Sequence, residues 1–216
     1  MKKIKFQYTP VQYEILCSNM EYRFKIVPKG RRLGLTIGMA FNLIDNMLDG
    51  KRTYLWGDVT LGNIRRYVDR IIAPKLRKYN ISYKFNRQDF TLELGDSICD
   101  FRSADRPENW EGFGYDKIYL NEAGIILRNE YLWDNAIRMM LLDNDQSEAV
   151  IAGTPKGNRG KFPELWEISQ SGNKEYWGKR FTTYDNPLLN AVEIEKIANE
   201  LPRKVIRQEI YGDFVS

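Results

Sequence analysis

Short apolar runs suited to buried strands alternate along the chain with helical patterns, and this alternation is the strongest constraint on the fold. The first run contains Phe24, Ile26 and Val27, and later runs cover residues 53–56, 118–120 and 149–152. Strands that alternate with helices predict an α/β fold with a mainly parallel central sheet flanked by helices. Ligands bind such sheets at the carboxyl ends of the strands, so the first strand, turn and helix are the first place to look for a site.

Several segments between these runs have helical periodicity. In residues 36–48 the spacing predicts one buried helix face, made of Ile37, Phe41, Ile44 and Leu48. Further helices are predicted around Ile64–Leu76, around Trp133, Ile137 and Met140, and over 191–211 with Ile194, Ile197, Leu201 and Val205 on one face. Pro74 predicts a kink or early end, and Pro202 predicts the start of a second short helix. Three short strands are predicted at 83–85, 91–94 and 97–101.

Length and composition fit one domain with a real core. The chain has 216 residues, 43% of them hydrophobic, and a formal net charge of +4, so we expect a single domain over 1–216 with a helical end at 191–216. This mild charge is compatible with a nucleic-acid or nucleotide partner but does not require one. No run approaches the roughly 18 apolar residues of a membrane span. The opening MKKIKFQYTP lacks the apolar region of a signal peptide, so we expect no membrane partner and no secretion.

The absence of histidine from the sequence excludes whole classes of chemistry. Ser-His-Asp catalysis, Cys-His catalysis and His-based zinc sites are all impossible. The two cysteines, Cys17 and Cys99, are far apart, which fits a reduced cytoplasmic protein rather than a disulfide framework. Any chemistry must therefore use carboxylates, lysine, arginine, hydroxyls, backbone amides and a bound metal.

The turn after the first strand has features of a phosphate-binding loop, and it reads Lys29-Gly30-Arg31-Arg32-Leu33-Gly34-Leu35-Thr36. The standard pattern, G-x-x-x-x-G-K-[ST], would place lysine where Leu35 stands and glycine where Lys29 stands. The physical requirements can still be met. Gly34 lets backbone N–H groups approach a phosphate at a helix amino end, and the Thr36 hydroxyl is placed for Mg²⁺. The Lys29 ammonium can reach the phosphates from the front of the loop, and Arg31 and Arg32 add planar donors. An ordinary basic loop with a helix cap is the alternative.

Two later strands also end in polar residues. Asn121 and Glu122 follow the strand at 118–120, where P-loop ATPases have Asp-Glu. Glu122 keeps the carboxylate needed to activate water, whereas Asn121 can accept a hydrogen bond from a metal-bound water but brings no charge. Thr154 follows the strand at 149–152, where its hydroxyl can sense a γ-phosphate. Ordinary polar caps and a Gly/Pro turn are the alternatives.

Together, in this order, the three motifs resemble the large terminases of tailed phages, some of which carry the lysine at the front of the loop. The likeness covers nearly the whole chain. Thr9-Pro10-Val11-Gln12 is similar to the adenine-recognition segment of that family, and the other similar stretches are 101–112, Gly153-Thr154-Pro155 and 208–214.

The resemblance implies a P-loop NTPase fold of the ASCE/RecA-like type, with ATP and Mg²⁺ as cofactors. It implies Lys29, Arg31 and Glu122 as catalytic residues, with Arg32 as the alternative to Arg31 for the arginine that acts within the subunit. It implies metal contacts from Thr36 and Asn121. The implied nucleotide contacts are Gln12, Lys29, Gly30, Arg31, Arg32, Leu33, Gly34, Leu35, Thr36 and Thr154.

The resemblance also implies that ATP hydrolysis drives double-stranded DNA into a procapsid, in the host cell cytoplasm and transiently at the portal. The implied partners are the portal protein, the small terminase subunit and further copies of the chain in a ring. Family members usually continue into a nuclease domain that nothing after Gly212-Asp213-Phe214 can supply, so we expect a fragment without nuclease activity. Two other readings stay open: a helicase-like, nucleic-acid-stimulated P-loop ATPase, and a non-catalytic nucleotide-binding assembly module in which Leu35 and Asn121 mark a decayed site.

Overall fold

A single mixed sheet forms the centre of the molecule in the computed structural model, which describes residues 6–110 and 112–216. Within those residues, eight strands lie in the order β3-β4-β5-β2-β6-β7-β1-β8. The pairs from β5 through β2, β6, β7 and β1 to β8 are parallel, while β3, β4 and β5 pair antiparallel. The predicted α/β class and mainly parallel sheet are therefore confirmed. The strands are β1 (Phe24–Pro28), β2 (Thr53–Asp58), β3 (Lys84–Asn86), β4 (Thr91–Leu94), β5 (Ser97–Ser103), β6 (Lys117–Asn121), β7 (Glu148–Gly153) and β8 (Tyr176–Gly178).

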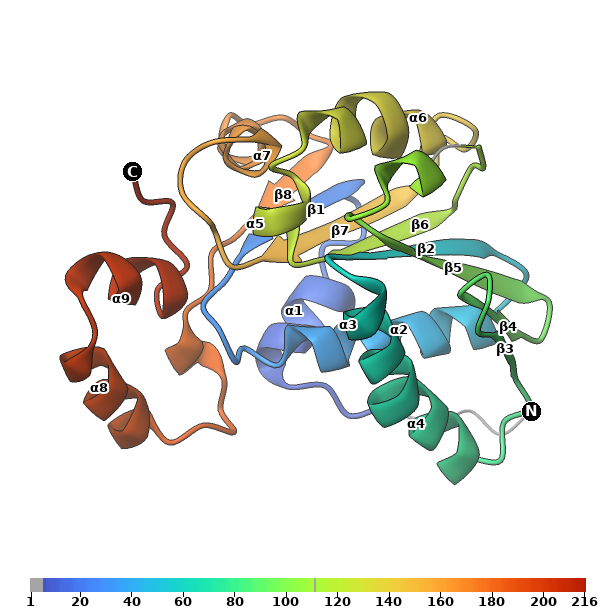
Figure 1. Ribbon diagram of the computed structural model, residues 1–216, viewed down its shortest axis with the longest axis horizontal. Coiled ribbons are helices and arrows are strands. Elements are labelled where there is room, and N and C mark those ends of the chain that lie inside the picture. The colour runs from blue at the N-terminus through green and yellow to red at the C-terminus, as the bar shows by residue number, and fades with distance from the viewer. Residues whose placement is uncertain (1–5, 111) are drawn as a thin grey trace.

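Helices cover both faces of the sheet (Figure 1). One layer contains α1 (Pro10–Leu16), α2 (Leu35–Leu48), α3 (Leu61–Tyr67), the π-helical turn η1 (Val68–Ile72) and α4 (Ala73–Lys78). The other contains α5 (Ala123–Ile126), the π-helical turn η3 (Leu132–Ile137), α6 (Arg138–Met140) and α7 (Lys161–Gln170). Beside the sheet lie α8 (Ala191–Glu200) and α9 (Arg203–Glu209), drawn in red in Figure 1, and the 3-10 turns are η2 (Pro107–Trp110) and η4 (Thr183–Asp185).

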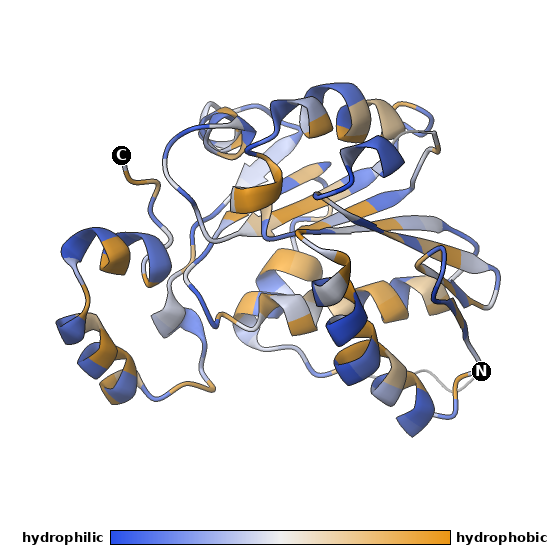
Figure 2. Cartoon of the chain, viewed as in Figure 1, coloured by the Kyte–Doolittle hydropathy of each residue, from blue (hydrophilic) through white to orange (hydrophobic). Residues whose placement is uncertain are grey.

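The buried strands are continuous apolar runs because their side chains pack into hydrophobic clusters on both faces of the sheet. Phe24 and Ile26 pack into the cluster under α5, η3, α6 and α7, whereas Val27 packs into the cluster under α1 to α4. Successive side chains of a strand point to opposite faces, so a strand covered on both faces must be apolar at nearly every position. Figure 2 shows the result as hydrophobic colour along the inner strands and hydrophilic colour along α3 and α4.

The predicted buried face of α2 is only partly confirmed, since Ile44 is fully buried and Leu48 packs against the core but the other two residues are not buried. Ile37 is 45% exposed and Phe41 is only partly buried, while Leu35, Met39 and Leu43 are fully buried. The helix is apolar around most of its circumference, so more than one stripe satisfies helical spacing. The stripe that packs on the sheet is the one that contains Leu35, Met39 and Leu43. Ile37 therefore faces the groove beside α4.

The two proline predictions have different outcomes. Pro74 does not end its helix, because the helical stretch continues through the π-helical turn η1 directly before Pro74 and then through α4 to Lys78. Pro202 does precede a new helix, α9. The predicted stripe over 191–211 fails at this break, because Leu201 is extended and Ile197 is 55% exposed.

No helix among the described residues is long and apolar enough to cross a membrane. The interpretation of the amino-terminal segment as something other than a signal peptide concerns Met1 to Lys5, which lie outside the described residues, as does Glu111 in the family-like stretch 101–112.

Candidate active site

The loop between β1 and α2, residues 29–36, is anchored through its backbone. Its first three N–H groups donate to carbonyl oxygens of distant segments: Lys29 to Gly153 (3.0 Å), Gly30 to Phe181 (2.9 Å) and Arg31 to Glu209 (2.7 Å). The approach is so close that a Cβ atom on Gly30 would lie 2.2 Å from the carbonyl oxygen of Ile210. The opening of the loop is therefore fixed by three segments that are remote in sequence.

The carbonyl groups of the same loop are held by side chains. Their donors are Thr183 Oγ1 to Arg31 (2.8 Å), Asn186 Nδ2 to Arg32 (2.6 Å) and Gln12 Nε2 to Gly34 (2.9 Å). Arg32 and Gly34 adopt left-handed backbone conformations, with φ of 62° and 83°. Within the described part of the chain, the N–H groups of residues 32–36 form no hydrogen bond. Because these carbonyls are occupied and the N–H groups of residues 32–36 are free, the loop can donate hydrogen bonds to an anion, and α2 adds the positive end of its dipole.

Lys29 is the buried cation of this loop. Its side chain is about 6% exposed, and its Nζ lies 3.8 Å from Oε1 of Glu122, at the end of β6. Burial lowers the pKa of Lys29, while the nearby Glu122 carboxylate opposes that shift. Leu35, in the usual lysine position, is 1% exposed and belongs to the hydrophobic core. Lys29 is thus the ammonium group that the structure brings to the loop.

Glu122 has a backbone conformation that few residues of its type adopt. It lies in the left-handed region, with φ 68° and ψ 42°, as β6 turns into α5. Such a conformation costs a non-glycine residue on the order of 1–3 kcal/mol and is typical of functional positions. Its carboxylate is partly solvent-accessible, with the side chain 26% exposed. The turn therefore presents a carboxylate that both solvent and the Lys29 ammonium can reach.

A chain of polar groups runs from α2 across two strand ends. Thr36 Oγ1 donates to Asn121 Oδ1 at 2.9 Å, and Asn121 Nδ2 donates to Asp58 Oδ2 at 2.7 Å. Asp58 ends β2 and is fully buried, as is Asn121. Burial raises the pKa of Asp58, while hydrogen bonds from Asn121, Asn63 and the Val59 N–H oppose the shift. Asp58 is a buried carboxylate that the sequence analysis missed.

Glu209 of α9 forms ion pairs with both Arg31 of the loop and Lys156, which follows β7. Burial disfavours its ionisation, but hydrogen bonds from Lys156 and Arg31 outweigh that effect and lower the pKa of Glu209 from 4.5 to about 2. Thr154, 1% exposed, directly follows β7 and precedes Lys156 by two residues. The carboxyl ends of β1, β6 and β7 therefore lie together at one edge of the sheet, the edge at which these parallel strands end. The ion pairs of Glu209 connect α9 to this edge.

These residues fit a magnesium ion that arrives with a nucleotide rather than a resident metal. No group of three or more Asp, Glu, Cys or His residues suited to a metal exists in the described ranges. The Thr36 hydroxyl gives its proton to Asn121 and keeps its lone pairs for a cation. Mg²⁺ characteristically uses one or two protein ligands, several waters and substrate phosphates, so this donor set is sufficient for it.

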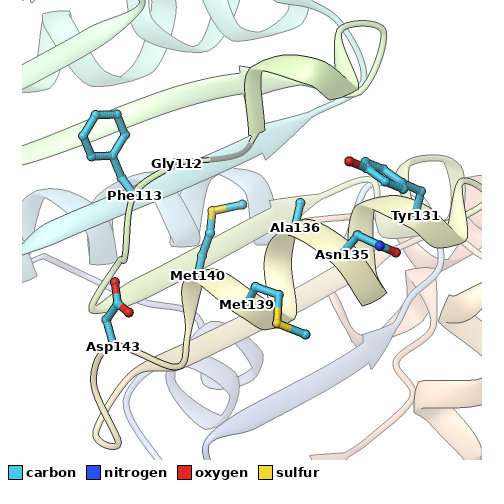
Figure 3. A pocket seen from close by; sticks show the side chains of 8 residues that line it. All are labelled: Gly112, Phe113, Tyr131, Asn135, Ala136, Met139, Met140 and Asp143. Atoms are coloured by element: carbon cyan, nitrogen blue, oxygen red, sulfur yellow. The ribbon is translucent and has the colours of Figure 1, made fainter.

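A cavity of about 440 Å³ lies away from this edge, beside the amino end of β6 (Figure 3). It is lined by Gly112, Phe113, Tyr131, Asn135, Ala136, Met139, Met140 and Asp143. Because β1 and β6 run parallel within the sheet, residues that precede β6 lie at the edge opposite the phosphate loop. No lysine or arginine lines this cavity, so it has no cation to pair with a phosphate. Its volume is therefore no reason to place the nucleotide there.

Comparison with solved structures decides the fold family. No protein-family model and no curated protein matches the sequence. The ATPase domain of the large terminase of Thermus phage P74-26 matches the structure with a TM-score of 0.83, at 19% identity, over 97% of this chain and 95% of that chain. The chain has the fold of a large terminase ATPase domain.

Two longer terminases match as well. The large terminase of a thermophilic bacteriophage, solved in a complex with ADP, has a TM-score of 0.78 at 18% identity, over 97% of this chain. The large terminase of bacteriophage HK97 has a TM-score of 0.76 at 13% identity, over 96% of this chain. The chain spans 54% and 51% of those two proteins, about half of each. The resemblance and the P-loop NTPase fold inferred from the sequence are confirmed at the level of the fold.

The terminase fold brings most of the predicted site residues together. Lys29, Thr36, Asn121 and Glu122 meet at one edge, while Arg31 and Arg32 are exposed on the loop. Gln12, expected to recognise adenine, hydrogen-bonds the loop itself, and Leu33 and Leu35 are buried in the core. The roles of all these residues, and the single domain over 1–216, stay predictions. Sequence reasoning missed Asp58, Thr183, Asn186 and Glu209.

Only one of the missed residues carried a usable signal. Asp58 follows an apolar strand, like Asn121, but that strand was predicted to end two residues early, at Trp56. Thr183, Asn186 and Glu209 act on the loop from segments more than 150 residues away. No local pattern marks Thr183 or Asn186, and Glu209 lies in the family-like stretch 208–214 without any sign of its partner.

Proposed function

We propose that this chain is an ATPase motor domain of a viral large terminase, which hydrolyses ATP with Mg²⁺ to drive double-stranded DNA into a procapsid. The observation that carries the proposal is the meeting of Lys29 and Glu122, 3.8 Å apart, beside a loop whose N–H groups at residues 32–36 form no hydrogen bond among the described residues. A cation and an anion-binding loop suit a triphosphate, and a carboxylate facing them suits activation of water.

Each residue then has a defined task. The N–H groups of the loop and the Lys29 ammonium bind the phosphates, and Arg31 stabilises charge on the γ-phosphate once it leaves Glu209. Glu122 accepts the proton of the attacking water, and Thr154 detects the γ-phosphate at the end of β7. Thr36 and Asn121 hold Mg²⁺, which neutralises phosphate charge when bound. Gln12 fixes the loop at Gly34 and recognises the adenine that lies against it.

The large terminase of the thermophilic bacteriophage supports a nucleotide partner, because its structures contain ADP or ATPγS on the same fold. The packaging role rests on the shared fold alone, since the sequences are 13–19% identical. We place the domain in the host cytoplasm, with a portal protein, a small terminase subunit and further copies of the chain as partners during packaging.

The test is steady-state ATP hydrolysis in the presence of Mg²⁺. Glu122→Gln should lower kcat by about 100-fold or more while nucleotide still binds, and Lys29→Ala should lower both binding and turnover. Exposed residues of the same types, Lys51→Ala and Glu167→Gln, serve as controls and should leave the rate unchanged. If both site variants hydrolyse ATP at the parental rate, the assignment is wrong. Calorimetry that detects nucleotide binding by a parent that does not hydrolyse ATP would favour the non-catalytic nucleotide-binding module, and strand separation would favour a helicase.

For the DNA we propose the outer surface of α3, η1 and α4. Residues 61–78 hold six basic side chains and one acidic one, a formal charge of +5 against +4 for the whole chain. None of the six forms an ion pair with a described carboxylate. The positive charge of the protein is thus concentrated in one helical segment, which suits a partner rich in phosphates. The six are Arg65, Arg66, Arg70, Lys75, Arg77 and Lys78.

Salt dependence of duplex binding tests this surface. Arg65→Ala together with Arg66→Ala should weaken binding and reduce the slope of log affinity against log salt by roughly one for each lost phosphate contact. Arg203→Ala with Lys204→Ala removes the same charge from α9 and is the matched control. Equal slopes for the two pairs would exclude residues 61–78 as the DNA contact.

A further inference from the structure

The end of β6 lacks the acidic residue expected beside a magnesium ion, but the neighbouring strand supplies one. Asp58 ends β2, and Asn121 ends β6. The two strands pair in parallel with Gly57 opposite Leu120, so Asp58 and Asn121 follow in adjacent positions. Both are 0% exposed. A buried carboxylate therefore stands one strand away from the position where its charge is expected.

The hydrogen bonds of Asp58 all come from neutral donors. Oδ2 accepts from Asn121 Nδ2 at 2.7 Å, and Oδ1 accepts from the Val59 N–H at 2.7 Å and from Asn63 Nδ2 at 3.1 Å. No lysine or arginine of the described ranges forms an ion pair with it. Buried charges are normally paired, since an uncompensated ion in the interior is costly. When it is ionised, Asp58 therefore carries a negative charge that no described lysine or arginine neutralises.

The carboxylate also fixes the orientation of the amide between it and the phosphate loop. An ionised carboxylate only accepts hydrogen bonds, so the amide must turn its NH₂ group toward Asp58. The amide oxygen of Asn121 then faces Thr36, whose hydroxyl donates to it at 2.9 Å. Carboxylates that orient the ligands of a metal in this way commonly change its affinity by about 10–100-fold.

We propose that Asp58 is a positioning residue for the magnesium ion, which orients Asn121 and supplies the negative charge that Asn121 lacks. This inference rests on the proposed ATPase function. Asp58 does not touch the nucleotide in this arrangement, because Asn121 stands between it and Thr36. The competing explanation is purely structural: Asp58 also ties the start of α3 to β2 through Val59 and Asn63.

An exchange of the two side chains separates these explanations. Asp58→Asn removes the charge and should weaken ATPγS binding in Mg²⁺ by roughly 10–100-fold, while binding in EDTA should change less than about threefold, a difference below about 1 kcal/mol. Asp58→Asn combined with Asn121→Asp restores one carboxylate and one amide in contact. We expect the exchanged pair to recover parental Mg²⁺ dependence within about threefold, a difference below about 1 kcal/mol.

Asp116→Asn is the matched control. It makes the same chemical change at the amino end of β6, where Asp116 accepts hydrogen bonds from Thr53, and should leave the Mg²⁺ dependence unaltered. Calorimetric titrations of ATPγS with and without Mg²⁺ give the affinities, and thermal unfolding verifies folding. If Asp58→Asn does not fold, the exchanged pair decides alone.

Three results would overturn the proposal. Parental Mg²⁺ dependence in Asp58→Asn would show that the charge is not used. Equal losses with Mg²⁺ and with EDTA would show a structural role only. The double variant Asp58→Asn with Asn121→Asp could also fold and bind ATPγS with the same affinity in Mg²⁺ and in EDTA. That result would contradict the proposal that the Asp58 carboxylate supplies the charge for Mg²⁺. A parent protein that binds no nucleotide under either condition would instead refute the proposed function, and this inference with it.

Discussion

The phosphate loop (residues 29–36) and the C-terminal helical end (residues 191–216) touch each other but are held in place differently. Every backbone N–H group of the loop up to Arg31 is bonded to a segment remote in sequence, and side chains hold three of its carbonyls. The helical end has a small core of its own, Ile194, Ala198 and Ile210. Its α8 leaves Val192 and Ile197 more than half exposed.

The difference indicates where stability and responsiveness lie. The loop is fixed before any ligand arrives, which suits a site that must present N–H groups without reorganisation. The helical end meets the loop through Glu209, whose carbonyl accepts from the Arg31 N–H and whose carboxylate pairs with the Arg31 side chain. Changes at this contact should therefore affect both regions, whereas changes on the outer side of α8 should affect neither.

The largest effect is expected at Gly30. A Cβ atom there would lie 2.2 Å from the carbonyl oxygen of Ile210 and 2.6 Å from the backbone N of Thr183, and neither can move without displacing its segment. Gly30→Ala should cost about 1–3 kcal/mol of unfolding free energy, with a fall in Tm of roughly 2–4 °C per kcal/mol. Gly50→Ala, which meets no atom within 4 Å, is the control for thermal unfolding. Equal Tm values for the two variants would contradict the close contact.

A smaller effect is expected from Glu209→Gln. The substitution removes the ion pairs with Arg31 and Lys156, and should lower the unfolding free energy by up to about 1 kcal/mol, since Arg31 is largely exposed. Glu193→Gln, which breaks an exposed pair with Lys196 on α8, is the matched control and should have less effect. Denaturant titration at neutral pH measures both.

The contribution of Glu209 should also depend on pH in one direction. Its pKa is about 2 in the folded protein against 4.5 as the ordinary value, so its stabilisation is present above pH 4.5 and is lost as the pH falls from 4.5 toward 2. The stability difference between the parent and Glu209→Gln should shrink over that range. A difference that stays constant down to pH 2 would show that the ion pairs do not stabilise the fold.

The smallest effect is expected on the outer face of α8. Val192 is 62% exposed, so Val192→Ser should change stability by less than about 0.5 kcal/mol. The measurement is again thermal or denaturant unfolding, now across a range of protein concentrations. A loss well above this value, or one that depends on protein concentration, would mean that the face is covered in solution and that the helical end is better anchored than its contacts indicate.

Sequence patterns placed the inner strands because a strand buried on both faces has few alternatives to an apolar run, and those at 118–120 and 149–152 proved only slightly longer. The strand at 91–94, buried at alternate positions, was placed correctly to the residue, whereas β8 was not predicted. Helix faces were predicted poorly. An α2 that is apolar around most of its surface allows several stripes, and only its packing on the sheet exposed Ile37 and buried Met39.

The sequence by itself determined the chemistry available at the site. It places Lys29, Asn121 and Glu122 at the ends of strands, which a parallel sheet must gather on one edge, and it places Thr36 at the start of the helix that follows the first strand. Tertiary structure decided how those groups are held. Asp58 became the partner of Asn121 only through the pairing of β2 with β6, and Glu209 reached Arg31 only through the return of the chain after β8. Contacts between segments far apart in sequence leave no local pattern, because a polar residue that makes such a contact has the same kind of sequence neighbours as an ordinary solvent-exposed polar residue.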